Sequence, residues 1–166
     1  MIISHIVAVD KNGVIGKDNQ TPWQVDGELS RFRELTMGNY LLMGRRTYRG
    51  LPKALDGRKI IVLSKTMQAD DDAVSVARSL AEALAVAERG GCKELFIGGG
   101  GQLYKSTMQM LDKLYLTRID IAVEGDTYYP IEEVKNYRLT YSETFRTNAT
   151  YTYQTYLTPK YLKMSK

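Results

Sequence analysis

The sequence is poor in the residues that carry disulfide and metal chemistry. Its 166 residues include one cysteine, Cys92, and one histidine, His5. A single cysteine excludes an internal disulfide framework and the zinc sites that use several cysteines. His5 lies within a short apolar run, where a packed or surface strand residue is a more common finding than a ligand. These absences favour a site without a bound metal.

Long apolar segments are also missing. The first apolar run is short and is interrupted by Ser4 and His5, unlike the apolar core of a signal peptide. No run is long enough to cross a membrane. We therefore expect a cytoplasmic protein with no membrane partner.

Charge of one sign is only slightly in excess. The chain has 23 Lys and Arg against 19 Asp and Glu, a net charge of +4. This balance suits a small anionic ligand as well as it suits nucleic acid or a membrane surface. No run of Lys and Arg is long enough to form a nucleic-acid-binding arm, so we expect no nucleic-acid partner. RNA binding is the alternative, and a steep salt dependence of RNA affinity would support it.

Strand and helix patterns alternate along the chain. Short apolar runs rich in β-branched residues predict strands at residues 2–9, 40–43, 59–63, 73–76, 94–97 and 113–119. Predicted helices occupy residues 26–37, 45–48, 79–89 and 102–108. Alternating Tyr and Thr at residues 137–145 and 151–157 are typical of a closing antiparallel pair. We predict one α/β domain over residues 1–159 and a loose basic tail at 160–166. Its central sheet is mostly parallel, with an antiparallel C-terminal strand and helices on both faces.

The least usual local pattern surrounds the only tryptophan. Asp26 is a good N-cap for a helix that runs to Met37. Within that helix Glu28, Phe32 and Leu35 share one face, which is otherwise apolar. A carboxylate on such a face is a candidate functional group. The alternative is that Glu28 favours the helix dipole and points to water.

A run of four glycines follows the predicted strand at residues 94–97. Gly98–Gly101 stands between that strand and a helix, where backbone N–H groups can receive a phosphate. A tight packed turn is the alternative. Arg45 and Arg46 follow a second strand, and Ser64 and Lys65 follow a third. If these strands are neighbours, their ends converge where open α/β sheets bind ligands, and the extra cations favour NADPH over NADH.

These motifs together resemble the bacterial dihydrofolate reductases, from Ile3 to about Leu157. The resemblance rests on motifs in the order and close to the spacing of that family. They are Gly13-Val14-Ile15-Gly16, Pro22-Trp23 with Glu28 six residues after the proline, Met43-Gly44-Arg45-Arg46-Thr47, Gly57-Arg58-Lys59, Gly99-Gly100, Tyr115-Leu116-Thr117 and Glu124-Gly125-Asp126-Thr127. The resemblance implies NADPH-dependent reduction of 7,8-dihydrofolate to tetrahydrofolate, with water-mediated protonation of N5.

The resemblance also implies a role for each matching residue. Glu28 would be the pterin-binding acid, Trp23 would hold an ordered water and Thr117 would brace the acid. The positions expected to bind substrate are Ala8, Leu29, Phe32, Leu51, Leu55, Arg58 and Gly98, with Arg58 on the glutamate carboxylate. The positions expected to bind cofactor are Ile15, Gly16, Asn19, Arg45, Arg46, Thr47, Ser64, Lys65, Gly99, Gly100, Gly101, Gln102, Leu103 and Tyr104. Residues 12–23 would form a mobile lid.

Three positions depart from the pattern of that family. The acid is Glu28 where many bacterial members have Asp, Gly98 replaces an aliphatic residue, and Thr21 replaces Met or Leu in the lid. Glu at the acid position also occurs in mobile trimethoprim-resistant reductases, which this chain resembles. With Glu28 and Gly98 in one pocket, we expect an enzyme that uses dihydrofolate, binds antifolates and binds trimethoprim weakly. We expect a monomer because no sustained exposed apolar pattern suggests an interface.

Two other functions compete with this interpretation. A pyrimidine reductase of riboflavin synthesis has a similar fold and an NADPH site, but it would not need Pro22-Trp23, Glu28 and Arg58 together. A non-catalytic nucleotide-binding module would bind NADPH without turnover of dihydrofolate.

Overall fold

A computed structural model describes residues 1–18, 20–51, 56–69 and 74–165 of the chain. The strands are β1 (Ile2–Val9), β2 (Val14–Gly16), β3 (Tyr40–Gly44), β4 (Lys59–Leu63), β5 (Val74–Ala77), β6 (Glu94–Ile97), β7 (Lys113–Ile119), β8 (Thr127–Tyr128), β9 (Arg138–Arg146) and β10 (Thr150–Leu157). The α-helices are α1 (Ser30–Thr36), α2 (Arg45–Gly50), α3 (Leu80–Arg89), α4 (Gly101–Ser106) and α5 (Pro159–Met164), and two 3₁₀ helices are η1 (Met108–Met110) and η2 (Ile131–Asn136).

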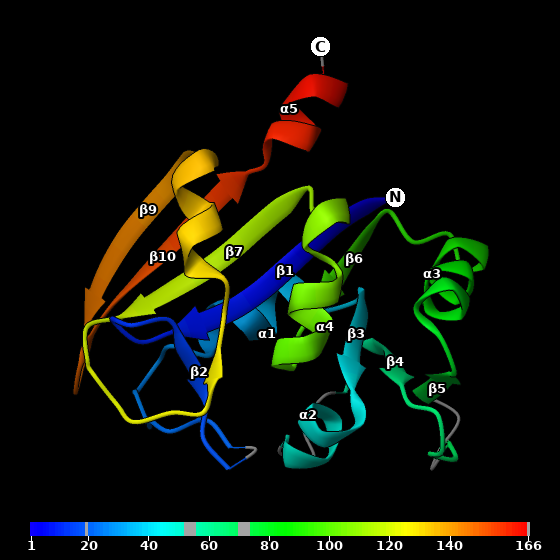
Figure 1. Ribbon diagram of the computed structural model, residues 1–166, viewed down its shortest axis with the longest axis horizontal. Coiled ribbons are helices and arrows are strands. Elements are labelled where there is room, and N and C mark those ends of the chain that lie inside the picture. The colour runs from blue at the N-terminus through cyan, green and yellow to red at the C-terminus, as the bar shows by residue number, and fades with distance from the viewer. Residues whose placement is uncertain (19, 52–55, 70–73, 166) are drawn as a thin grey trace.

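Eight strands form one twisted sheet in the order β5-β4-β3-β6-β1-β7-β10-β9 (Figure 1). Pairing is parallel from β5 through β7. It becomes antiparallel at β10 and β9. The predicted mostly parallel sheet with an antiparallel C-terminal pair is confirmed. A β2–β8 pair forms a second, two-stranded sheet, which the sequence pattern did not predict.

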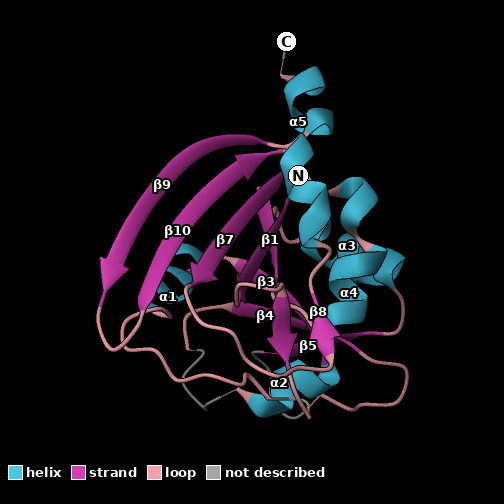
Figure 2. Ribbon diagram, turned by 60° about the vertical axis from the view of Figure 1, so that its left-hand side comes forward, coloured by secondary structure: helices cyan, strands magenta, loops and turns pink. Residues whose placement is uncertain are grey.

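Helices cover both faces of the large sheet, as predicted. One face packs against α3, α4 and η2 through a core that includes Ala83, Leu103 and Val134. The other packs against α1 and α2 through Phe32 and Tyr48. In Figure 1, α4 lies in front of the sheet and α1 behind it, and Figure 2 shows the same layers from the side of β9. Because both faces are covered, the central strands are apolar on both sides.

The carboxyl ends of β3 and β6 are joined directly. The Gly98 N–H donates to the Leu42 carbonyl at 2.9 Å, and the Gly44 N–H donates to the Gly99 carbonyl at 2.8 Å. Since β4, β3, β6 and β1 are consecutive in the sheet, the segments that follow them lie along one edge. The predicted convergence of strand ends is therefore met.

The start of α1 differs from the prediction. The helix begins at Ser30, its N-cap is Leu29, and that residue makes no side-chain capping bond. Asp26 therefore does not cap the helix, and residues 26–29 form turns instead. Gly27 has a φ of +87°, in the left-handed region that cannot continue a helix. Glu28 thus stands in a turn and not on the helical face with Phe32.

The predicted loose tail is wrong for residues 160–164. Thr158 caps α5 by accepting a hydrogen bond from the Tyr161 N–H, and Pro159 occupies the first turn. The Lys160 ammonium lies 2.7 Å from a carboxylate oxygen of Asp112, whose side chain is buried. The helix is therefore attached to the domain. Among the described residues, no helix is long and apolar enough to span a membrane.

Candidate active site

A cavity of about 560 Å³ lies along the carboxyl edge of the sheet. Its walls come from β1, the β2 segment, the turn before α1, α1, α2, the glycine run, β7 and β8. The predicted site residues that line it are Ala8, Ile15, Gly16, Trp23, Glu28, Leu29, Phe32, Arg46, Thr47, Leu51, Gly98, Gly99, Gly100, Gly101, Tyr104 and Thr117. Residues far apart in the sequence thus share one concave surface.

The remaining predicted site residues fall into two groups. Those outside the cavity lining are Arg45, Arg58, Ser64, Lys65, Gln102 and Leu103. Asn19 and Leu55 lie outside the described residues, so their predicted roles stay predictions. Leu103 is buried in the core between α4 and the sheet and does not line the cavity.

Glu28 is the buried acid of this cavity. Its side chain belongs to a residue only 7% exposed. Burial raises the pKa of the Glu28 carboxyl, and the nearby Trp23 indole lowers it in part. The Trp23 Nε1–H is buried and has no hydrogen-bond partner among the described residues. The indole N–H therefore lies near the acid and favours its ionised form, although its geometry falls short of a hydrogen bond with a described residue.

Thr117 lies on β7 in register with Ala8 of β1, so both face the cavity from adjacent strands. Its residue is 7% exposed. The Thr117 hydroxyl and the Glu28 carboxyl are not joined by a hydrogen bond in this structure. The bracing role expected for Thr117 stays a prediction.

The glycine run lies beside the start of α2 in the cavity wall. Gly99 has a φ of +100°, which favours glycine. A Cβ on Gly100 would lie 3.3 Å from the Thr47 hydroxyl oxygen, so glycine lets the backbone approach α2 closely here. Arg46 and Thr47 of α2 line the same cavity. Glycine backbone, a cation and a hydroxyl together fit the phosphates of a dinucleotide such as NADPH.

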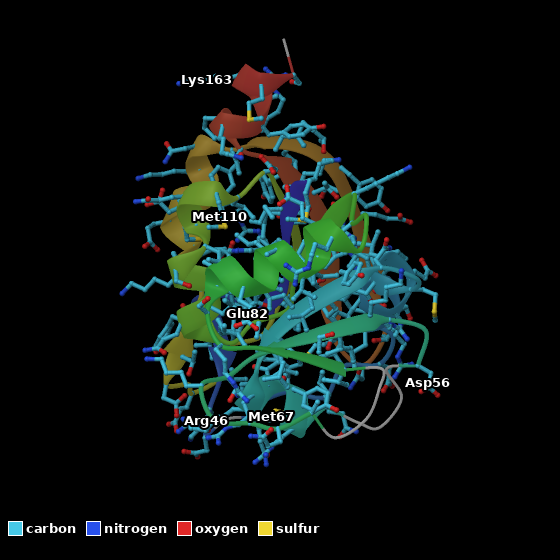
Figure 3. All side chains as sticks on the ribbon, turned by 90° about the vertical axis from the view of Figure 1, so that its right-hand side faces the viewer. Arg46, Asp56, Met67, Glu82, Met110 and Lys163 are labelled. Carbon is cyan, nitrogen blue, oxygen red and sulfur yellow. The ribbon has the colours of Figure 1, made fainter. Side chains whose placement is uncertain are left out.

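Arg46 lies at one end of the molecule, far from Lys163 of α5 at the other (Figure 3). Ser64 follows β4 near the Arg46 end, but its hydroxyl accepts hydrogen bonds from the Thr66 and Met67 N–H groups at 3.3 and 3.0 Å. It therefore closes a local turn. Ser64 and Lys65 do not line this cavity, so their predicted contact with the cofactor stays a prediction.

Arg58 is buried at 7% exposure, and its guanidinium is bonded to the segments around it rather than lining the cavity. Its Nε–H donates to the Thr36 hydroxyl at 3.1 Å. Its two terminal nitrogens donate to the carbonyls of Asp56 and Arg33, each at 2.8 Å. These bonds with described residues use three of the five guanidinium N–H groups, and the other two have no partner among the described residues.

The predicted lid is attached to the β8 loop. The Lys17 ammonium lies 3.0 Å from the Glu124 carboxylate, on the surface. The Asp18 N–H donates to the Asp126 carboxylate at 2.9 Å. The Asp126 N–H in turn donates to the Gly16 carbonyl at 3.0 Å. These bonds hold the segment that contributes Ile15 and Gly16 to the cavity lining, and a Cβ on Gly101 of the glycine run would lie 3.8 Å from Ile15 Cδ1.

Some cavity residues were not among the predicted site residues. These are Ile6, Val7, Gln20, Thr21, Arg31, Gly50 and Thr127. Arg31 is the charged member of this group, and its position three residues after Glu28, which puts both on one face of the predicted helix, was the signal that could have found it. Thr127 belongs to a motif of the resemblance, which was the one signal that could have found it.

The fold and the site together define a class of protein. It is an α/β enzyme that binds a dinucleotide at the carboxyl ends of parallel strands and places a buried carboxylate beside it. A family model for dihydrofolate reductase matches residues 2–160. The chain belongs to the dihydrofolate reductase family, and it is an NADPH-dependent oxidoreductase.

Several relatives agree with this assignment. The chain is 43% identical over 130 residues to dihydrofolate reductase type 3 of Salmonella typhimurium, covering 78% of this chain and 79% of that protein. It is 36% identical over 155 residues to dihydrofolate reductase type 1 of Escherichia coli, covering 93% and 97%. A solved structure of dihydrofolate reductase from Enterococcus faecalis, complexed with NADP(H) and RAB-propyl, superposes with a TM-score of 0.81. That structure is 31% identical and covers 94% of this chain and 95% of its own.

Proposed function

We propose that this protein reduces 7,8-dihydrofolate to 5,6,7,8-tetrahydrofolate, with Glu28 as the acid that promotes protonation of N5. The buried carboxyl beside the dinucleotide wall carries this proposal. Bound NADPH supplies the hydride, and one proton from solvent completes the reduction. The chain must therefore hold the pterin and bring a proton to one ring nitrogen.

The elevated pKa of Glu28 suits this task. Burial favours the protonated carboxyl, while hydrogen bonds to a bound pterin favour its ionised form. An acid whose pKa lies nearer to neutrality exchanges protons more readily at neutral pH. The free Trp23 N–H can orient a water between the acid and the pterin. We expect Thr117, which lines the same cavity, to bond the carboxylate once the ligand is bound.

The apolar walls define where the rest of the substrate lies. Phe32, Leu29 and Leu51 line the cavity and would pack against the pterin and aminobenzoyl groups. The two free N–H groups of Arg58 would take the glutamate α-carboxylate, which a planar guanidinium binds in bidentate fashion. Leu29 is 49% exposed, as a residue that contacts a ligand at the cavity mouth should be.

Turnover of dihydrofolate tests this function directly. NADPH oxidation with dihydrofolate should proceed in the wild type and collapse in Glu28→Gln, which keeps the shape of the side chain but removes its acid. Binding of NADPH without oxidation by dihydrofolate would contradict the assignment, and a pyrimidine substrate of riboflavin synthesis would then be tested. We also propose a monomer, and a mass near 18.8 kDa by light scattering is the expected result.

We further propose that the enzyme binds trimethoprim weakly. Glu28 is one methylene longer than the Asp of many family members, which shifts the acid relative to a bound diaminopyrimidine. A Cβ on Gly98 would lie 3.3 Å from Leu41 Cδ1 and 4.0 Å from Phe32, so a side chain there needs a small shift of Leu41 and would add an apolar surface beside Phe32. Glycine there removes apolar contact area from any ligand.

Inhibition constants for trimethoprim test this second proposal. We expect weak inhibition of the wild type and tighter inhibition of Gly98→Ala and Glu28→Asp, with dihydrofolate turnover retained. Since Gly98→Ala adds at most one methyl group of contact with the ligand, we expect an effect of at most about 0.8 kcal/mol, or roughly fourfold. An inhibition constant as tight as that of a sensitive bacterial enzyme would contradict the proposal.

A further inference from the structure

We propose that Arg31 and Tyr153 form a latch that positions Glu28, and that both are positioning residues for the reduction. The inference rests on the proposed role of Glu28 as the acid. It concerns the backbone that carries the acid, since Glu28 stands in a turn between the lid segment and α1 and has no helix of its own to hold it.

Tyr153 holds this turn from β10. Its hydroxyl lies 3.0 Å from the Gly27 carbonyl and 3.1 Å from the Glu28 carbonyl, and it donates to this pair. The same hydroxyl accepts a hydrogen bond from the Arg31 N–H at 3.4 Å. The Tyr153 hydroxyl therefore links the carbonyls of Gly27 and Glu28 to the first turn of α1.

Arg31 completes the latch in the opposite direction. Its Nη1 donates to the Gln154 carbonyl at 2.8 Å and to the Leu116 carbonyl at 3.4 Å, and its Nη2 donates to the Thr155 hydroxyl. The Tyr153 side chain of β10 thus bonds to the backbone at the start of α1, and the Arg31 side chain of α1 bonds to the backbones of β7 and β10. Two connections that run in opposite directions fix both the position and the rotation of the turn.

The strands that receive the latch also carry the opposite wall of the site. Tyr153 is in register with Thr117, and the Leu116 carbonyl that Arg31 binds belongs to the residue before Thr117. Arg31 itself lines the cavity. The latch therefore sets the separation between Glu28 on one side and Thr117 on the other.

The chemistry of Arg31 argues against simple packing. Its guanidinium carbon lies 5.3 Å from the ring centres of Tyr115 and Tyr153 and 5.6 Å from that of Tyr141. Among the described residues no carboxylate forms an ion pair with it, so burial without a counterion lowers the pKa of Arg31. Aromatic faces offset this cost only in part. An apolar side chain would pack there at lower cost but could not reach three oxygen acceptors.

Tyr153→Phe tests the latch because it removes one oxygen atom and keeps the ring. We expect kcat/KM for dihydrofolate to fall about tenfold, which corresponds to the loss of one hydrogen bond that positions the acid. The dissociation constant for NADPH should stay unchanged, because the turn that carries Glu28 does not hold the cofactor. Tyr151→Phe is the matched control. Tyr151 lies two residues away on the same strand, and its hydroxyl makes no hydrogen bond with another described residue, so its kcat/KM should match the wild type.

Arg31 is tested by a pair of substitutions. Arg31→Met keeps the length of the side chain and removes all its donors, whereas Arg31→Lys keeps a charge and part of the hydrogen bonding. We expect kcat/KM for dihydrofolate to fall about tenfold in Arg31→Met and to recover in part in Arg31→Lys. Equal losses in both, accompanied by equal loss of NADPH binding, would indicate a general structural role and overturn the proposal.

A double-mutant cycle shows whether the latch acts through the acid. Single-turnover hydride transfer is measured in wild type, Tyr153→Phe, Glu28→Gln and the double variant. If the latch positions Glu28, Tyr153→Phe should have no further effect once the acid is gone. The same tenfold loss in both backgrounds would overturn the proposal. Failure of the wild type to reduce dihydrofolate, or an unimpaired Glu28→Gln, would instead contradict the proposed function, so the two failures are distinguishable.

Discussion

The buried His5 makes the stability of this protein sensitive to mild acid. The side chain is fully buried on β1, with Nδ1 2.8 Å from the Tyr129 hydroxyl and Nε2 2.7 Å from the Thr107 hydroxyl. The Thr107 hydroxyl donates to the Leu103 carbonyl at 2.7 Å, so it accepts from Nε2–H. Nδ1 consequently accepts from Tyr129, and the neutral ring satisfies every bond.

The expected loss of stability follows from the shift in the pKa of His5. Burial lowers it from 6.5 to about 3, so between these values the unfolded chain binds a proton that the folded chain does not. Stability is therefore complete above pH 6.5 and is lost as pH falls toward 3. Each pH unit within this window costs up to 1.36 kcal/mol, which gives about 2 kcal/mol between pH 7 and pH 5.

Urea unfolding at pH 7 and pH 5 measures this effect. His5→Gln has neutral donors and acceptors at both pH values, so it should lack the His5 contribution. It should be less stable than the wild type at pH 7, by about 2 kcal/mol, because an amide cannot match both bonds. On going to pH 5 the wild type should lose about 2 kcal/mol more than the variant. Equal losses in both proteins would refute the assignment of a neutral buried ring.

Three further predictions concern single positions. Glu28→Gln should raise the free energy of unfolding of the ligand-free protein, and the gain should be larger at pH 8 than at pH 4. Burial raises the pKa of the Glu28 carboxyl, so the ionised acid destabilises the fold once the pH exceeds the usual pKa of a glutamate. Urea unfolding at both pH values checks this. Gly27→Ala places a Cβ 2.7 Å from the Tyr151 hydroxyl at a φ of +87°, so it should cost about 1–3 kcal/mol and raise KM for dihydrofolate in steady-state assays. Asp112→Ala leaves the Ile3 N–H, now bonded at 2.9 Å, without a partner; calorimetry should show a loss of about 1–3 kcal/mol, against less than about 1 kcal/mol for Lys160→Met.

Local patterns were sufficient to predict the sheet. Each strand of the parallel region was predicted within one or two residues, because apolar runs bounded by turn residues depend only on neighbouring positions. The strand–glycine–helix arrangement at Gly98–Gly101 was also evident from the sequence. The structure gives one reason for glycine there, because Gly99 has a positive φ that favours a residue without a Cβ. The neighbouring order of β4, β3 and β6 was needed to turn these signals into one site.

The start of α1 and the C-terminal helix show where local patterns are insufficient. Asp26 has the residue type of an N-cap, but Gly27 takes a left-handed conformation and delays the helix to Ser30. Residues 160–164 are helical because Asp112 and Thr158 hold them to the domain. A short helix gains little from its own hydrogen bonds, so its formation depends on contacts that the local sequence does not display.

The sequence by itself therefore determined the family, the order of the elements and the residue types at the site, because these follow from motifs and short periodicities along the chain. Only the tertiary structure decided how the acid is held. Tyr153 meets the Glu28 carbonyl across 125 positions of sequence, and Arg31 reaches β10 across a similar distance. Such contacts depend on strand order, register and turn conformation together, and none of these is visible in the residues that flank either partner.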